Sequence, residues 1–177
     1  MNIQETNVPE FAGARPIVVG VNGSRASLAA LQWAVVEAAK LNVPLVMVHA
    51  WEPSGRLRAP YASVTERRTP AEDRATGQRL VQAAVSAVLT AHPGADVRAA
   101  LTEGPPVPVL LRYTDDALLL ALGQSLYQDG SPTVLGPVTR ACVSESRCPV
   151  VTVPDFPVTA HDGELPAAAP LEAAFVG

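Results

Sequence analysis

The residues best placed to do chemistry lie in two glycine-bearing segments, each between an apolar strand-like run and a predicted helix. The shorter segment, Asn22-Gly23-Ser24, follows the run at Pro16–Val21. The longer one, Gly123–Val138, follows the run at Ala117–Leu122. In an open parallel sheet, a glycine loop that leads into a helix holds phosphate groups on backbone N–H groups. The spacing of the longer segment therefore indicates anion binding. For the shorter segment, a plain turn with a helix cap is the simpler interpretation.

Further polar groups are expected at the same edge of the sheet, because ligands of such sheets bind beyond the carboxyl ends of the strands. His49 and Trp51 end the second apolar run, and Gly104 follows the third. A nucleotide there would place its base near the second run and its phosphates at the start of the last helix. The candidate nucleotide-binding residues are Asn22, Gly23, Ser24, Met47, Gly104, Gly123, Gln124, Ser125, Gly136, Pro137 and Val138.

The motifs of several enzyme classes are missing from the sequence. It contains no P-loop motif, no G-x-G-x-x-G after the first strand and no G-x-S-x-G around a serine. His49 has no acid or base beside it in sequence, which favours a structural role. We therefore expect no catalytic residue, although slow ATP hydrolysis is left open. Cys142 and Cys148 lack metal-ligand spacing, so no metal site is expected.

Composition and charge narrow the class of partner. The chain has 177 residues, of which 48% are hydrophobic, and its formal net charge is −4. A negatively charged chain with a single lysine, Lys40, is not expected to bind nucleic acid. No run of about 20 apolar residues predicts a membrane span, and the polar start shows no signal-peptide pattern. These features, with two cysteines expected to stay reduced, predict a cytoplasmic protein.

Five aliphatic runs alternate with four helical patterns, which predicts an α/β fold. The expected architecture is a single doubly wound domain, with a five-stranded parallel sheet in the order 3-2-1-4-5 and helices on both faces. The helices are expected from a cap at Ser24 or Ser27 to Lys40, from a cap at Thr69 to the stop at His92, over Val107–Tyr113 and over Val138–Ser146. The strands are expected at Pro16–Val21, Val43–Ala50, Asp96–Leu101, Ala117–Leu122 and Cys148–Val153.

Three segments follow from these patterns. Residues 1–15 show no periodicity and are expected to be a flexible lead-in, and residues 16–153 form the α/β domain. Residues 154–177, rich in proline and alanine, are expected to be an extension outside the core. Within the domain, Gly123–Leu135 is predicted to be a mobile loop at the ligand edge.

Several pieces of the chain, in order and at the expected separations, resemble the universal stress protein family. They are IVVGVNGS with the helix and strand that follow it, the turn EGPPVPVL, the run LLLALG, and RCPVVTV. The resemblance covers Arg15–Pro154. It implies a Rossmann-like fold and a homodimer, commonly paired through the last strand, here Pro149–Val153. The apolar edge formed by Val150, Val151 and Val153 is expected to pair antiparallel with that of a second copy.

The resemblance also bears on ligand binding, because some members of this family bind ATP and others do not. Gly123 and Gly136 match the glycine loop of the binders. Leu126 stands in place of its second glycine, Pro137 in place of a serine or threonine, and Asn22 in place of an acidic residue. The departures remove backbone freedom, a helix-start donor and a cation ligand.

Two functions remain open on this basis. The first is a homodimeric stress-response or regulatory protein with weak or absent ATP binding, which acts through an unidentified protein partner. The alternative is a member that binds ATP, AMP or a cyclic nucleotide through a relaxed phosphate loop, in which Gln124, Ser125, Ser131 and Thr133 supply donors.

Overall fold

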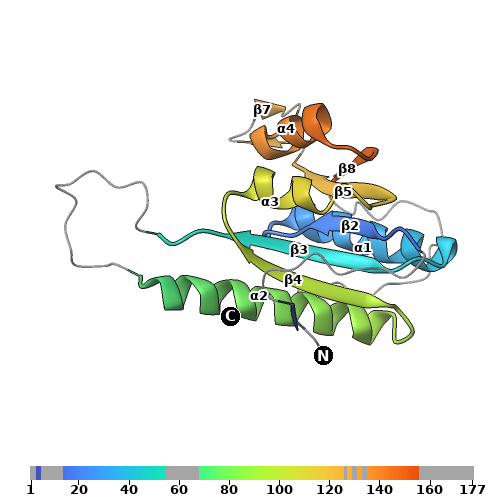
Figure 1. Ribbon diagram of the computed structural model, residues 1–177, viewed down its shortest axis with the longest axis horizontal. Helices are drawn as coiled ribbons and strands as arrows, with labels where there is room; N and C mark the ends of the chain where they lie inside the picture. Colours follow the sequence, from blue (N-terminus) through green and yellow to red (C-terminus); the bar gives the residue numbers. More distant parts are fainter. Residues whose placement is uncertain are drawn as a thin grey trace.

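The computed structural model describes residues 3–4, 14–54, 68–125, 127–128, 131–132 and 135–155. Strands and helices alternate through most of this range, as Figure 1 shows. The helices are α1 (Arg25–Leu41), α2 (Pro70–Ala91), α3 (Pro106–Arg112) and α4 (Pro137–Glu145). The strands are β1 (Ile3–Gln4), β2 (Ile17–Gly20), β3 (Leu45–Trp51), β4 (Val97–Glu103), β5 (Leu119–Gln124), β6 (Tyr127–Gln128), β7 (Ser131–Pro132) and β8 (Val150–Pro154).

The main sheet has the order β1-β4-β3-β2-β5-β8, and every neighbouring pair is parallel. Its five long strands, β4-β3-β2-β5-β8, confirm the predicted order 3-2-1-4-5. The short strand β1, which pairs only with Ala99 and Ala100 of β4, was not predicted. Two residues are too few to leave a periodic pattern in the sequence.

Two hydrophobic clusters, one on each face of the sheet, form the core. Side chains alternate between the faces along each strand, so that Ile17 and Val19 pack against α1 and α2, whereas Val18 packs toward α3 and α4. Figure 1 shows α2 running along β4 and α4 lying on the far side of β5. The strands read as continuous aliphatic runs because both faces of the sheet are covered.

Local sequence signals set the helix ends. The Ser24 side chain caps α1, and Asn42 ends it in the left-handed conformation at φ 53°. At α2, Thr69 and Glu72 form a reciprocal capping box, with proline at the first turn. The predicted boundaries of these two helices are therefore confirmed to within a residue or two. No helix in the described part of the chain combines the length and apolarity needed to cross a bilayer.

The segment predicted as a loop at Gly123–Leu135 contains strand residues, while its mobility stays a prediction. Gly123 and Gln124 extend β5, and β6 and β7 then pair antiparallel as a small hairpin. Leu126 and Thr133 lie outside the described residues, as do residues 55–67 and residues 156–177.

Candidate functional site

A pocket of about 230 Å³ opens at the carboxyl edge of the sheet, on the face covered by α3 and α4. It lies where β3, β2 and β5 end and where α1 and α4 begin. This is the position at which open α/β sheets bind ligands. The pocket is lined by Gly20, Val21, Asn22, Ser24, Ser27, Val48, Ala50, Pro106, Leu110, Leu122, Gly123, Val138 and Thr139.

One wall of the pocket is the start of α1, which forms a closed hydrogen-bond network. The Asn22 side-chain oxygen accepts from the Ser24 N–H at 3.1 Å, and the Ser24 Oγ accepts from the Ser27 N–H at 3.2 Å. The Ser27 hydroxyl donates to the Ser24 carbonyl at 2.9 Å and accepts from the Asn22 N–H at 3.3 Å. Each of these three side-chain oxygens therefore accepts a hydrogen bond that shapes the turn.

Gly123, at the end of β5, lies directly against this turn. A Cβ atom built on Gly123 would stand 2.2 Å from the Ala26 carbonyl carbon and 2.5 Å from the Ser27 nitrogen. No side chain fits at such distances, since the obstructing atoms are backbone. Glycine is thus required here for the close packing of β5 on α1, whatever ligand the pocket holds.

The opposite wall is the start of α4, and it carries no side-chain cap. Gly136 is the N-cap residue, Pro137 follows it, and no side-chain cap hydrogen bond is found at this helix start among the described residues. Val138 and Thr139 of the first turn line the pocket. An uncapped helix start attracts negative charge because its free N–H groups and the helix dipole both face outward.

The structure brings together four of the eleven predicted nucleotide-binding residues, namely Asn22, Ser24, Gly123 and Val138. Gly136 and Pro137 adjoin the pocket at the start of α4. The remaining five do not line the pocket. Met47 is fully buried on the face of the sheet covered by α1 and α2, and Gly23 packs against Leu80. Gly104 turns the chain after β4 at φ 137°, and the other two are Gln124 and Ser125.

The pocket also contains residues that the sequence did not single out as binding residues. The apolar end comes from β3 and α3, through Val48, Ala50 and Leu110. Thr139, which is 7% exposed, is the unexpected polar member. Its only sequence signal is its place at the third position of a helix that begins Gly-Pro.

His49 has a structural role at the same edge, on the other face of the sheet. Its Nδ1 donates to the Val21 carbonyl at 2.7 Å, and its ring packs on Gly77 of α2. Burial lowers the pKa of His49, and the hydrogen bond to Val21 only partly offsets that effect. The lowered pKa favours the neutral form of the ring, which anchors the strand end that precedes Asn22.

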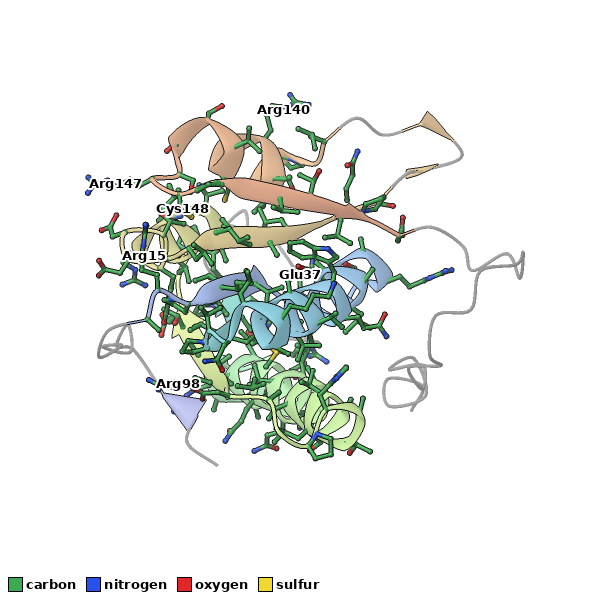
Figure 2. The ribbon with its side chains drawn as sticks, turned by 90° about the vertical axis from the view of Figure 1, so that its right-hand side faces the viewer. Arg15, Glu37, Arg98, Arg140, Arg147 and Cys148 are labelled. Atoms are coloured by element: carbon green, nitrogen blue, oxygen red, sulfur yellow. The ribbon has the colours of Figure 1, made fainter. Side chains whose placement is uncertain are left out.

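The charged side chains of the last third of the domain lie away from the pocket walls. Figure 2 shows Arg140 projecting outward from α4 and Arg147 at the amino end of β8. The Arg140 guanidinium donates to the Leu135 carbonyl at 3.3 Å, and Arg147 faces Asp115 at 3.5 Å. Within the described ranges, no group of three potential metal-binding side chains is found.

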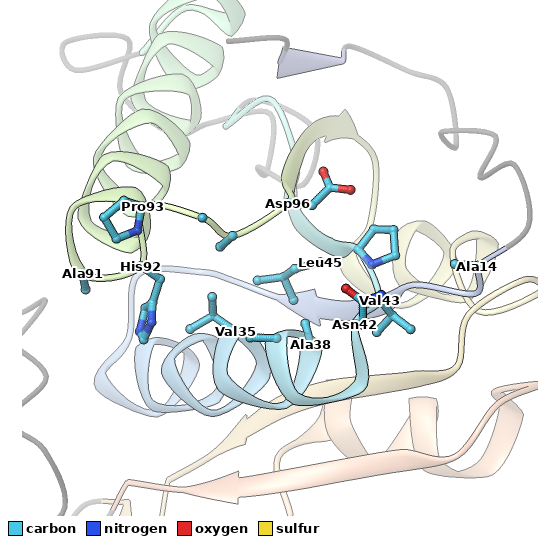
Figure 3. Close-up of a pocket in the computed structure, with 14 residues that line it drawn as sticks. Ala14, Val35, Ala38, Asn42, Val43, Leu45, Ala91, His92, Pro93 and Asp96 are labelled. Atoms are coloured by element: carbon cyan, nitrogen blue, oxygen red, sulfur yellow. The ribbon is translucent and has the colours of Figure 1, made fainter.

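A larger pocket, of about 710 Å³, lies at the opposite edge of the sheet between the ends of α1 and α2. Figure 3 shows that its polar side chains, His92, Asn42 and Asp96, stand at separate points of the rim. The wall between them is formed by small apolar residues such as Val35, and many of the lining residues are exposed. Its polar groups do not converge on one point, as they do in a ligand site.

The last strand, β8, is an edge strand of the described sheet. Val150, Val151 and Val153 are each half-buried. Val150 packs toward α3 and α4, and Val153 toward α1 and α2. An edge strand of this composition offers unpaired N–H and carbonyl groups to another strand.

Comparison with solved structures shows the same fold in several proteins. A universal stress protein from Archaeoglobus fulgidus matches with a TM-score of 0.59 at 23% identity, over 78% of this chain and 93% of that one. A universal stress protein solved in complex with cAMP matches with a TM-score of 0.54 at 23% identity, over 80% and 98%. A family protein from Arabidopsis thaliana with AMP bound matches with a TM-score of 0.53 at 19% identity, over 79% and 91%.

Comparison with curated proteins identifies relatives in mycobacteria. Universal stress protein Rv2028c of Mycobacterium tuberculosis is 31% identical over 137 residues, which are 77% of this chain and 47% of that protein. Universal stress protein Rv2624c of the same organism is 27% identical over 139 residues, covering 78% and 48%. The chain thus spans about half the length of these relatives. The model of the universal stress protein family matches residues 13–154, and the chain therefore belongs to that family.

Proposed function

We propose that this protein is a regulatory universal stress protein that binds an adenine mononucleotide, AMP or a cyclic form, and binds ATP weakly or not at all. The observation that carries the proposal is the polarised pocket at the carboxyl edge of the sheet. Its β3 and α3 end is apolar, and its other end joins Asn22 and Ser24 to the uncapped start of α4.

The two ends of the pocket suit the two ends of a nucleotide. Val48, Ala50 and Leu110 offer an apolar slot for a base, and the first turn of α4 offers N–H groups for a phosphate. The volume of about 230 Å³ lies below the roughly 300–1,000 Å³ of common ligand pockets. A mononucleotide fits this size better than a triphosphate with its cation.

The solved relatives support the choice of ligand. Structures of the same fold were determined in complex with cAMP, with AMP and with dAMP. The identity to each is 23% or less, so the pocket of this chain, rather than the likeness, carries the argument.

Two residues argue against strong binding of ATP with magnesium. Asn22 supplies no charge for a cation, and its side-chain oxygen is held by Ser24. Pro137 removes an N–H group from the start of α4. A triphosphate needs a cation to neutralise its charge and several hydrogen-bond donors to hold its oxygens. Its affinity therefore falls more through these two residues than the affinity of a monophosphate does.

We place binding rather than catalysis at this site. The described lining of the pocket contains no acid, base or thiol side chain. Burial, with a smaller effect of the Glu145 charge, raises the pKa of Cys142 to about 11, so this thiol is protonated and unreactive. Both cysteines are free, in accord with a cytoplasmic protein.

A second candidate function is contact with protein partners, beginning with a second copy of this chain. The exposed edge of β8, with Val150, Val151 and Val153, favours antiparallel pairing with its symmetry mate. Val151→Lys should convert a dimer to a monomer in light scattering at micromolar concentration. An unchanged mass would show that the interface lies elsewhere.

Titration calorimetry with AMP, cAMP and magnesium ATP tests the nucleotide proposal. We expect AMP or cAMP to bind at least tenfold more tightly than ATP. Tight ATP binding, or no binding of any of the three ligands, would contradict the proposal and favour the partner-binding function.

A further inference from the structure

We infer that helix α2 positions the turn Asn22-Gly23-Ser24 from the face of the sheet opposite the pocket, through Leu80, and that nucleotide affinity depends on this contact. The inference rests on the proposed function. Leu80 is a positioning residue in this scheme, because its side chain does not line the pocket and acts through the turn, whose Asn22 and Ser24 do.

The two sides of the turn face different parts of the molecule. Asn22 and Ser24 line the pocket, on the side of α3 and α4. Gly23, between them, faces α2, since a Cβ atom built on it would stand 2.9 Å from the Cδ1 atom of Leu80. Gly23 has φ 82°, a left-handed conformation that glycine adopts without the strain a Cβ atom would bring. The Leu80 side chain therefore packs directly on the backbone of the turn.

A second contact from the same helix supports the residue that precedes the turn. Gly77 lies about one helical turn before Leu80, and a Cβ atom built on it would stand 3.0 Å from the His49 ring. The Nδ1 atom of that ring donates to the Val21 carbonyl at 2.7 Å, and Val21 also lines the pocket. Helix α2 thus contacts the turn directly at Gly23 and supports its entry through His49.

Helix α2 is itself fixed in place on both sides of these contacts. Near its start, the Asp73 carboxylate accepts the Ser54 N–H at 2.7 Å and the Ser54 hydroxyl at 2.8 Å, which ties the helix to the chain that leaves β3. Beyond Leu80, the buried residues Val81 and Val88 hold the helix on the sheet. Leu80 is partly buried against the same core cluster, so it presents a fixed surface to the turn.

The hydrogen bonds of the turn and the contact with Leu80 have different effects. The four bonds among the turn residues and Ser27 fix the shape of the turn. Contacts from other elements fix its place, with β5 reaching the start of α1 through Gly123 and α2 reaching Gly23. Removal of the Leu80 side chain therefore leaves the hydrogen bonds intact and removes the support behind the two pocket residues.

Leu80→Ala tests the inference, and Val88→Ala is the matched control. Val88 is a buried residue of the same helix and core cluster, about 12 Å farther along the helix axis. Leu80→Met restores the bulk of the side chain, and Leu80→Val is a milder truncation for the same comparison. Each protein is titrated with AMP, alone and combined with Asn22→Ala, and is unfolded in urea. The amide NMR signals of the turn are recorded without ligand.

We expect Leu80→Ala and Val88→Ala both to unfold at a lower urea concentration. Leu80→Ala alone should shift the amide signals of the turn and weaken AMP binding, by about tenfold. Leu80→Met should restore the affinity, and Leu80→Val should lose less than Leu80→Ala. Combined with Asn22→Ala, Leu80→Ala should have a much smaller effect, because the pocket residue through which it acts is already lost.

The outcomes separate the inference from the proposed function. An equal loss of AMP affinity in Val88→Ala would assign the effect to general stability, and additive losses with Asn22→Ala would show that Leu80 acts elsewhere. Either result would overturn the inference, as would an unchanged AMP affinity or unchanged turn signals in Leu80→Ala. Failure of the unaltered protein to bind AMP would overturn the proposed function, while the turn signals would still show whether α2 holds the turn.

Discussion

Two helix starts form opposite walls of the same pocket, and they differ in how their N–H groups are satisfied. At α1, Ser24 caps the helix, and Asn22 and Ser27 complete a closed network. At α4, Gly136 offers no cap, and a buried hydroxyl beside it has no partner among the described residues. The contrast distinguishes the start of α1, a closed start that stabilises the fold, from the start of α4, an open start at which we propose that the ligand binds.

A stable protein can leave only a few such groups unsatisfied. An orphan N–H at a helix start or a lone buried hydroxyl costs stability that a cap would restore. At α1 the capping network restores that stability, whereas at α4 no side chain among the described residues does so. Substitutions at the closed start should therefore change stability more than substitutions at the open start.

Gly123→Ala should break the closed start most severely. The added Cβ would meet the backbone of Ala26 at 2.2 Å, so β5 or α1 must shift. We expect a loss at or above the upper end of about 1–3 kcal/mol in the free energy of unfolding, measured in urea. Gly94→Ala is the matched control, because no atom lies within 4 Å of its Cβ, and it should stay within about 0.5 kcal/mol. A fold equally stable with alanine at residue 123 would show that the two elements are not packed so closely.

Ser24→Ala should weaken the same start without any steric clash. It removes the oxygen that accepts from the Ser27 N–H at 3.2 Å. Loss of a serine cap costs about 0.5–2 kcal/mol in the free energy of unfolding. Ser86→Ala, on the exposed face of α2, changes the same atoms without a cap and should cost less than about 0.5 kcal/mol. Equal stabilities of the two variants in urea would argue that the network at α1 contributes nothing.

The closed start could be predicted from the sequence, because caps are local patterns. The sequence places Ser24 as one of two candidate caps, and Thr69 with Glu72 three residues later predicts the capping box at α2. The strand order was also predictable, because five aliphatic runs separated by helices leave few ways to build a right-handed parallel sheet. These features depend on neighbours in sequence or on general rules of topology.

The start of α4 was predicted as the phosphate position, but the burial of Thr139 beside it was not, because that burial depends on contacts between distant elements. Thr139 becomes significant only when α4 packs against the sheet and buries it. Met47 was expected in the site, but β3 turns it toward α1 and α2 while its neighbour Val48 lines the pocket. Neighbouring residues of a strand point to opposite faces of the sheet. In a strand that is buried on both faces, the sequence alone does not show which residues point to which face.

His49 supports the closed start from the other face, and its contribution should depend on pH. Burial holds the pKa of His49 in the folded protein below its ordinary value. The unfolded chain therefore binds a proton that the folded one resists. Stability is fully present above about pH 6.5 and is lost as the pH falls toward the folded pKa, by at most about 1.4 kcal/mol per pH unit.

His49→Asn isolates this contribution, since asparagine keeps a donor for the Val21 carbonyl but does not titrate. We expect the stability difference between the two proteins to change with pH only below about pH 6.5. A constant difference through the acid range would show that the His49 ring is as easily protonated in the fold as in the unfolded chain.

Gly136→Asp should close the open start, with the smallest effect on stability and a clear effect on binding. Gly136 has φ −63° and ψ 161°, and no neighbouring atom of the described residues lies within 4 Å of an added Cβ, so an aspartate fits as a cap. The gain over glycine is a few tenths of a kcal/mol from the cap, and the helix dipole adds to it. The same carboxylate would occupy the N–H groups and repel phosphate, so AMP affinity should fall at least tenfold.

Gly136→Ala is the control, because it adds the Cβ without the cap or the charge. It should bind AMP like the unaltered protein, and its free energy of unfolding should be about 0.5–2 kcal/mol lower than that of Gly136→Asp. If the aspartate variant gained stability and still bound AMP fully, the phosphate would not lie at α4, and the difference between the two helix starts would have no bearing on binding.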